Sequence, residues 1–331
     1  MRFLEHCGAW GRIPQERVTR VEAMRIYGDD ARAGLDFSAY DAGLRELAFI
    51  VEGRSLQESL HDSVEGQDLR MHRPADWRSL EFLPDHAAIT LGDGTVLRTR
   101  LVVGADGAES RVRAQSRIEV KATDYSQLGV VANFSCAKPH DGVAYQWFRR
   151  DGVLALLPLP GNRVSMVWSI AEPRGRELLA LPAAALAAEV EAASHSALGP
   201  LEVITPAAAF PLRLQRVTHF TRPRVALAGD AAHNLHPLAG QGLNLGFRDA
   251  RELAEVLRGR GPQRDCGDYA LLRRYERARK EDVAAMQLTT DGLQKLFNNE
   301  AVWLAGARNL GLTVLNGLPL LKNLLVHRAA A

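Results

Sequence analysis

Two short apolar segments, each running directly into glycine and aspartate, place the strongest constraint on how this chain can fold. Residues 101–103 (Leu-Val-Val) lead into the sequence GADG at 104–107, and residues 225–228 (Val-Ala-Leu-Ala) lead into Gly229-Asp230. A short apolar run is typical of a buried strand in a parallel sheet, and glycines at its end let a ligand approach the strand tip. The two segments therefore predict an α/β unit whose strand tips approach a ligand.

The chain between these segments follows a different pattern. Residues 128–170 are rich in Val, Phe, Tyr and Trp and contain three turn sequences with glycine, which predicts a mostly antiparallel sheet. An alanine-rich stretch predicts one helix over about 176–194. Helical periodicity then runs from about Gly242 almost to the end, with a break at Gly261-Pro262. This order predicts one domain assembled from discontinuous pieces, with a sheet domain inserted between them.

Three shorter elements complete the expected order. Residues 24–37 and 88–100 each contain two extended segments separated by glycine and aspartate, and each predicts a hairpin. Residues 54–64 predict a helix with Leu56 and Leu60 on one face.

The charge balance and the cysteines limit the classes of partner and compartment. The 331 residues include 41 basic and 39 acidic side chains, for a formal net charge of +2, which argues against nucleic acid as the main partner. The three cysteines are far apart and odd in number, so neither a disulfide framework nor a CxxC metal site is predicted. The first residues lack the apolar core of a signal peptide, and no uncharged apolar run reaches the roughly 20 residues that span a bilayer. These features predict a soluble or peripheral protein of the reducing cytosol.

The segment from Gly229 onward carries the clearest chemistry. Asp230, at a strand tip, can accept hydrogen bonds from the hydroxyl groups of a sugar-like chain. Glycines at 240 and 242 remove side chains, so that backbone can lie against a flat ligand. The helix that is expected to begin near Gly240 directs free N–H groups and a positive dipole end at that ligand. A ring that becomes anionic on reduction would be stabilised there.

These motifs carry a resemblance to a known family. GADGAESRVR (104–113) and GDAAHNLHPLAGQGLNLGFRDA (229–250) resemble the two downstream FAD motifs of flavoprotein hydroxylases built like para-hydroxybenzoate hydroxylase. The flanking text at 49–60, 272–299 and 308–326 resembles the ubiquinone-biosynthesis hydroxylases of the UbiH/UbiF/VisC type. The resemblance covers nearly the whole chain, with the two motifs in the family's order.

The resemblance implies a fold class and a domain plan. The fold class is α/β, with an incomplete Rossmann-like FAD-binding domain, an inserted mostly antiparallel β-sheet substrate domain and C-terminal helices. The FAD-binding domain is expected over residues 1–20, 45–120 and 215–260. The substrate-binding sheet domain is expected over residues 21–44 and 121–214, and the C-terminal helical region over residues 261–331.

The resemblance also implies roles for individual residues. Asp230 is expected to bond the ribitol chain of FAD, and Asp106 to lie near its ribose or pyrophosphate. Arg54 and Gln57 match family positions that face FAD. Residues of the second motif are expected to line the isoalloxazine mostly with backbone atoms: Pro237, Gly240, Gln241, Gly242, Leu243 and Asn244. Pro237, Gly240 and Gln241 form the expected catalytic environment, to which no acid, base or metal ligand is assigned.

The chemistry that the resemblance implies belongs mostly to the cofactor. NAD(P)H is expected to reduce FAD, which captures O₂ as a flavin C4a-hydroperoxide and transfers a hydroxyl group to an electron-rich phenol. The expected substrate is a polyprenyl-phenol intermediate of ubiquinone synthesis. Two alternatives stay open: a hydroxylase of a small soluble aromatic compound, and a non-catalytic scaffold in a quinone-synthesis complex.

The chain departs from the family pattern at its front. The family opens with a strand, a G-x-G-x-x-G turn and a helix, followed by an acidic residue at the end of the next strand. The first glycines here, Gly8 and Gly11, stand in HCGAWGRIP (6–14), which resembles family text after that unit. A βαβ unit takes about 30 residues. The sequence therefore predicts an N-terminal truncation of roughly that length, with a weaker hold on the ADP half of FAD.

Two further features allow more than one interpretation. His233 and His236 are three residues apart, but no cysteine or unused acid completes a ligand set, so packing near the flavin is favoured over metal binding.

The uncharged stretch between Arg308 and Lys322 has the length of a buried or interfacial helix. It fits either packing on the FAD domain or contact with a membrane or partner proteins. The second interpretation places a cytoplasmic protein peripherally on the inner membrane beside other ubiquinone-synthesis proteins, and self-association stays open.

Overall fold

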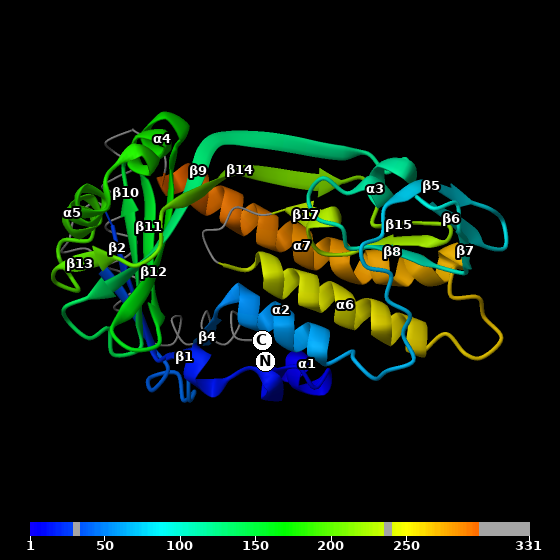
Figure 1. Cartoon of the computed structure of the whole chain (residues 1–331), viewed down its shortest axis with the longest axis horizontal. Helices are drawn as coiled ribbons and strands as arrows, with labels where there is room; N and C mark the ends of the chain where they lie inside the picture. The colour runs from blue at the N-terminus through cyan, green and yellow to red at the C-terminus, as the bar shows by residue number, and fades with distance from the viewer. Residues whose placement is uncertain (29–33, 235–239, 298–331) are drawn as a thin grey trace. The chain divides into compact units, whose positions relative to one another are not determined.

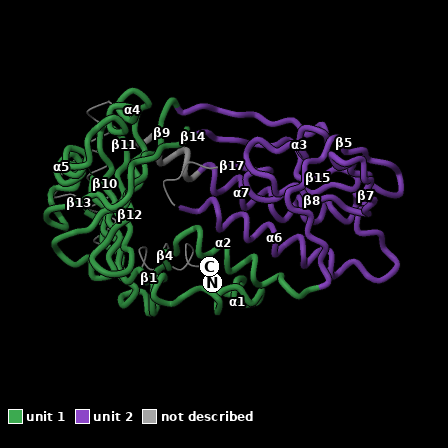
Figure 2. Tube along the Cα trace, in the orientation of Figure 1, with its two compact units in different colours: residues 1–67, 126–212, 293–331 green, residues 68–125, 213–292 purple. Residues whose placement is uncertain are grey.

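Two compact units make up the structure. The computed structural model describes residues 1–28, 34–234 and 240–297, with side chains described as far as residue 288. Within the described residues, the first unit holds 1–67, 126–212 and 293–297, and the second unit holds 68–125 and 213–292 (Figure 2). Each unit is thus built from segments that are far apart in the sequence.

A large sheet forms the centre of the first unit (Figure 1). Its strands are β2 (Ala23–Tyr27), β3 (Gly34–Ser38), β9 (Val120–Cys136), β10 (Val143–Arg149), β11 (Gly152–Leu159), β12 (Arg163–Ala171), β13 (Leu201–Val203) and β14 (Ala208–Val217). With the short strand β17 (His233–Asn234) at its edge, the order is β17-β14-β9-β12-β11-β10-β2-β3, and β13 pairs with β9. Strands β9 to β12 pair antiparallel, which confirms the sheet predicted over residues 128–170. Strands β2 and β3 confirm the hairpin over residues 24–37, and β2 runs parallel to β10.

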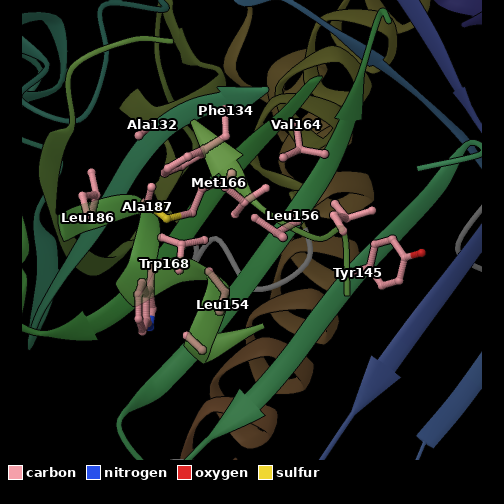
Figure 3. Close-up of a cluster of buried hydrophobic side chains, with 14 of the residues drawn as sticks. Ala132, Phe134, Tyr145, Leu154, Leu156, Val164, Met166, Trp168, Leu186 and Ala187 are labelled. Atoms are coloured by element: carbon pink, nitrogen blue, oxygen red, sulfur yellow. The ribbon is translucent and has the colours of Figure 1, made fainter. Parts of the chain in front are cut away.

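One face of this sheet carries the core of the first unit (Figure 3). Alternate residues of β12, namely Val164, Met166 and Trp168, are buried, as the period of two along a strand requires. Leu154 and Leu156 of the neighbouring β11 belong to the same cluster. Large apolar side chains on adjacent strands therefore hold this unit together through burial of their surface.

Two helices contribute to this core. Helix α4 (Glu172–Ala180) contributes Leu178, and helix α5 (Ala183–Ala193) contributes Leu186. The prediction of a single helix over residues 176–194 is wrong, because the helix breaks at Leu181-Pro182, where Leu181 is extended. Proline has no backbone N–H and disfavours helical conformation in the residue before it.

Short elements complete the first unit. They are α1 (Arg2–His6), the 3₁₀ turns η1 (Trp10–Arg12) and η2 (Gln15–Arg17), the strands β1 (Val18–Val21) and β4 (Ala48–Val51), and α2 (Gly53–Asp62). Strands β1 and β4 pair antiparallel. Helix α2 confirms the helix predicted over residues 54–64, and it buries Leu56.

The second unit contains both glycine-ended strands. Its elements are β5 (Trp77–Phe82), β6 (Ala87–Leu91), β7 (Val96–Thr99), β8 (Val102–Gly104), α3 (Arg111–Gln115), β15 (Thr221–Arg222), β16 (Val225–Leu227), η3 (Gly229–Ala231), β17 (His233–Asn234), α6 (Gly242–Arg258) and α7 (Tyr269–Phe297). Strands β6 and β7 confirm the hairpin over 88–100. Strands β15, β16 and β8 form one sheet, in which β16 and β8 are parallel neighbours. Both predicted strands are therefore confirmed; β16 is fully buried, whereas Val103 in the middle of β8 is 45% exposed.

The two units differ in extent from the domains that the sequence analysis expects. Residues 1–67 all lie in the unit with the large sheet, whereas residues 261–292 belong to the unit with the glycine-ended strands. The division into FAD-binding and substrate-binding domains stays a prediction. Among the helices that the structure describes, none is long and apolar enough to cross a membrane. The stretch between Arg308 and Lys322 lies outside the described residues.

Candidate functional site

The two glycine-ended strands of the second unit lie side by side and end together. Leu227 stands opposite Gly104 in the parallel register of β16 and β8. Just beyond, the N–H of Ala228 donates to the carbonyl oxygen of Gly104 at 2.9 Å. A Cβ atom at Gly104 would lie 2.8 Å from Leu227 and 2.9 Å from Val112, so a side chain there would push the strands and α3 apart. Two motifs separated by more than a hundred residues thus present their loops at one edge.

Asp230 lies in the turn that leaves β16. Gly229 before it has a φ of +60°, in the left-handed region that favours glycine. The Asp230 side chain reaches solvent, but nearby protein atoms still remove part of its hydration, and this desolvation raises the pKa of the carboxyl. The charge of His233, when protonated, acts in the opposite direction and lowers this pKa. The turn therefore presents a carboxylate with free space in front of the preceding glycine.

The raised pKa of Asp230 gives a pH-dependent prediction. If the ionised carboxylate accepts hydrogen bonds from FAD, FAD affinity should fall as the pH drops through the raised pKa. The fall should begin above the pH range in which an ordinary aspartate titrates, because the proton is held more tightly. FAD titrations across this range, followed by flavin fluorescence, check the effect. Asp230→Asn should bind weakly and without this pH dependence, and an equal pH dependence in both proteins contradicts the assignment.

The start of α6 is the second component of the candidate site. Gly240 has a φ of +59°, and among the described residues no atoms other than those of chain neighbours lie within 4 Å of the Cβ positions at Gly240 and Gly242. Gln241 precedes the helix without capping it, since its side-chain oxygen accepts from Nδ2 of Asn244 at 3.1 Å. An uncapped helix start carries N–H groups and a positive dipole end that stabilise negative charge. This end of α6, with Leu243 exposed beside it, suits a flat ligand that gains negative charge.

Helix α6 and the Asp230 turn lie close together. The Cβ position of Gly246, on the second turn of α6, lies 3.5 Å from Cα of Gly229. The structure therefore packs the turn that contains Asp230 against the second turn of α6, the helix whose start holds Gly242, Leu243 and Asn244. Pro237, which is also expected to line the isoalloxazine, lies outside the described residues.

Asp106 has a local structural role that the sequence analysis does not include. One carboxylate oxygen accepts from Oγ of Ser110 at 2.5 Å, and the other accepts from the backbone N–H of Val112 at 3.0 Å. Ser110 in turn caps α3 by accepting from the N–H of Arg113. Asp106 thus shapes the loop between β8 and α3, and its contact with a ribose or pyrophosphate stays a prediction.

Asp249 is a residue that the sequence reasoning quotes within a motif but gives no role. Its carboxylate is fully buried and accepts from the N–H of Gly229 at 2.8 Å. It also binds Nε2 of His233 at 2.7 Å and Nε of Arg279, from α7, at 2.6 Å. A sequence signal exists, because Leu245, Asp249 and Leu253 are spaced four apart and share the buried face of α6. An acid inside such an apolar stripe needs a buried partner.

Arg113 is a second residue missed from the sequence. Its side chain is buried, and it donates to the carbonyl oxygen of Ala108 at 2.7 Å and to that of Ala231 at 3.0 Å. Ala108 belongs to the first motif and Ala231 to the second. A single guanidinium therefore ties the two motif loops together, a role that suits its planar set of donors.

Arg54 and Gln57 belong to the first unit, on α2. The Arg54 side chain is 89% exposed and pairs with Glu58 one turn later at 2.8 Å. Gln57 is exposed as well. That both residues face FAD stays a prediction. They belong to the first unit, whereas Asp230 and the start of α6 belong to the second.

Comparison with known proteins places this arrangement in a family. The model of the FAD binding domain family matches residues 1–290. The ubiquinone hydroxylase UbiL of Rhodospirillum rubrum is 35% identical over 332 residues, which cover 99% of this chain and 76% of the relative. The 3-demethoxyubiquinol 3-hydroxylase of Escherichia coli is 34% identical, over 94% of this chain and 79% of the relative.

A solved structure shares the fold. That of PqsL from P. aeruginosa, in complex with 2-aminobenzoylacetate, superimposes with a TM-score of 0.76 at 23% identity, covering 93% of this chain and 86% of the other. At that identity the similarity shows the fold alone. Together with the family match and the two hydroxylases, it leads to one conclusion: the chain belongs to the family of FAD-dependent monooxygenases that includes the ubiquinone-biosynthesis hydroxylases.

Proposed function

We propose that this protein is an FAD-dependent monooxygenase that hydroxylates a polyprenyl-phenol intermediate of ubiquinone biosynthesis. The observation that carries the proposal is the meeting of the Asp230 turn with the uncapped start of α6 in the second unit. This places an acceptor for hydroxyl groups beside an end of a helix that favours negative charge. The names of the two hydroxylases above supply the reaction class and the pathway.

The residues present fit the flavin half of FAD. Asp230 would hold the ribitol hydroxyl groups. Backbone at Gly240 and Gly242 would lie against the ring, since the part of the chain that the structure describes leaves open the space where their side chains would start. When bound, FAD supplies the oxidising chemistry. The protein's own part is to position the ring, to stabilise negative charge through the N-terminal end of α6 and to exclude water.

Replacing Asp230 with alanine should weaken FAD binding by about ten- to a hundredfold. The reason is the loss of a charge-assisted hydrogen bond worth about 1.5–3 kcal/mol. Titration of flavin fluorescence measures the dissociation constant. Arg251→Ala, on the exposed face of α6, is the matched control and should leave the affinity unchanged, because the Arg251 side chain is directed to Glu255 one turn later on the helix.

The proposed substrate can be separated from the alternatives in one assay. Protein supplied with FAD, NADH or NADPH and labelled O₂ is given a prenylated phenol, and incorporation of labelled oxygen is followed by mass spectrometry. The same phenol without its prenyl chain is the matched comparison. Preference for the prenylated phenol supports the proposal, and preference for the bare phenol indicates a hydroxylase of small soluble compounds. Absence of both flavin and turnover indicates a scaffold.

Contact with a membrane surface is part of the same proposal, because a polyprenyl chain partitions into lipid. Flotation of the protein with vesicles of anionic and zwitterionic lipid tests this contact. Protein that stays entirely in the unbound fraction with both lipids argues against it.

A further inference from the structure

The backbone on both sides of Asp230 is held by buried side chains from two other elements. On the N-terminal side, the carboxylate of Asp249 accepts from the N–H of Gly229 at 2.8 Å. On the C-terminal side, the guanidinium of Arg113 donates to the carbonyl oxygen of Ala231 at 3.0 Å. Asp249 is 0% exposed and Arg113 is 7% exposed, so water competes little for either hydrogen bond. The main chain at Asp230 is thereby fixed from α6 and from α3.

The Asp230 side chain, unlike the backbone around it, is not held by hydrogen bonds from the described residues. Among the described residues, its carboxylate has no hydrogen-bonding partner within the protein. A fixed main chain with an unengaged carboxylate is the arrangement expected of a pre-organised acceptor, which loses little freedom when a ligand binds. Glycine adopts the φ of +60° at Gly229 without strain but also populates many other backbone conformations, so the hydrogen bond to its N–H restricts a position that would otherwise be free to move.

The carboxylate that binds the N–H of Gly229 is itself held by a buried arginine. Arg279 on α7 donates from Nε to Asp249 at 2.6 Å and from a terminal nitrogen to Asp282 at 2.6 Å. These carboxylates raise the pKa of Arg279 despite its burial. An ionised carboxylate makes a stronger hydrogen bond to a backbone N–H than a neutral acceptor does. Arg279 therefore holds the carboxylate of Asp249 in place.

We infer that Asp249 and Arg113 are positioning residues, here named the tip clamp, which hold Asp230 in the orientation in which it binds FAD. The inference rests on the proposed function of Asp230. The tip clamp does not touch the cofactor but acts through the main chain at Gly229 and Ala231. Its role goes beyond stabilising the fold, because it fixes the two peptide groups that flank the carboxylate proposed to bind the ribitol chain.

A double-mutant cycle tests the tip clamp. Asp249→Asn and Arg113→Met are each made alone and together with Asp230→Ala, and FAD dissociation constants are measured by fluorescence titration. Each single change should weaken FAD binding at least about tenfold, given the cost of a lost charge-assisted hydrogen bond. In the Asp230→Ala background the same changes should weaken it by no more than roughly twofold, the error of additive behaviour. Equal losses in both backgrounds overturn the inference.

Arg224 offers a matched control for the loss of a buried arginine. It is 6% exposed and donates to the carbonyl oxygens of Leu83, Pro84 and Arg100, in the same unit but at the opposite end of β16 from Asp230. Arg224→Met should lower the melting temperature as Arg113→Met does, yet leave FAD affinity unchanged. A loss of FAD affinity in Arg224→Met equal to that in Arg113→Met overturns the inference, because general destabilisation would then account for both.

Hydrogen exchange provides a readout that needs no cofactor. In FAD-free protein, peptides covering residues 225–234 should exchange faster in Asp249→Asn and Arg113→Met, and at the unchanged rate in Arg224→Met. Unchanged exchange in both clamp variants overturns the inference even if FAD affinity falls. If the unaltered protein binds no FAD, the proposed function of Asp230 fails, and the exchange rates still decide whether the clamp orders this turn. Arg113→Met keeps the test available should Asp249→Asn fail to fold.

Discussion

Replacing Arg279 with methionine is expected to lower the free energy of unfolding by about 3–5 kcal/mol, the usual cost of leaving one member of a buried ion pair alone. Asp249 is fully buried and would lose its ion pair with Arg279. Denaturation in urea, followed by circular dichroism, measures the change. A loss of this size would be a large fraction of the stability of an ordinary domain.

Two companion variants show whether the effect comes from the unpaired charge. The double variant Asp249→Leu with Arg279→Met removes both charges and should recover much of the lost stability, because well-packed apolar residues often replace a buried ion pair at little cost. Arg277→Met, on an exposed face of the same helix, should change stability by no more than about 0.5 kcal/mol. If the double variant is as unstable as both single losses added together, the charge pairing is not the cause.

Replacing Gly240 with valine is expected to reduce FAD affinity by more than about a hundredfold and to abolish turnover. The left-handed φ of +59° costs a β-branched residue on the order of 1–3 kcal/mol of folding stability. The added side chain would also occupy the open space in which the isoalloxazine is proposed to lie. Flavin content and NAD(P)H-dependent oxygen uptake measure both effects.

Gly261 is the matched control for this substitution. It has a φ of +78° and no atoms within 4 Å of its Cβ position, so valine there meets the same backbone strain without a neighbouring site. It lies in the connection between α6 and α7, in the same unit as Gly240. Gly261→Val should lower stability and keep FAD affinity. Equal loss of FAD from both variants would assign the effect to strain and not to the proposed contact with the ring.

The sequence predicted those features that depend on a few neighbouring residues. Short apolar runs ending in glycine identified β8 and β16, and the aromatic and β-branched residues at 128–170 identified the antiparallel sheet. Both patterns reflect the local preference of the chain and the burial of a strand. The helix over 176–194 was predicted as one element although Pro182 lies inside it, because the alanine-rich pattern was given more weight than the proline.

The hydrogen-bond partners of Asp106 could not be predicted from the sequence. The sequence analysis treats it as a ligand contact, and the structure shows both carboxylate oxygens accepting hydrogen bonds at the start of α3. An acid after a strand tip can serve either purpose. The choice depends on the path of the next few residues, which the motif by itself does not specify.

By itself, the sequence determined the two glycine-ended strands, the antiparallel sheet at 128–170, the hairpins at 24–37 and 88–100, the helix at 54–64, and which family the motifs resemble. The tertiary structure alone decided that Asp249 lies between Gly229, His233 and Arg279, and that Arg113 joins Ala108 to Ala231. Local patterns are set by interactions within a few residues, so they can be read along the chain. A buried polar group takes whichever partners the packing of distant elements places within hydrogen-bonding distance, and that selection exists only once the chain has folded.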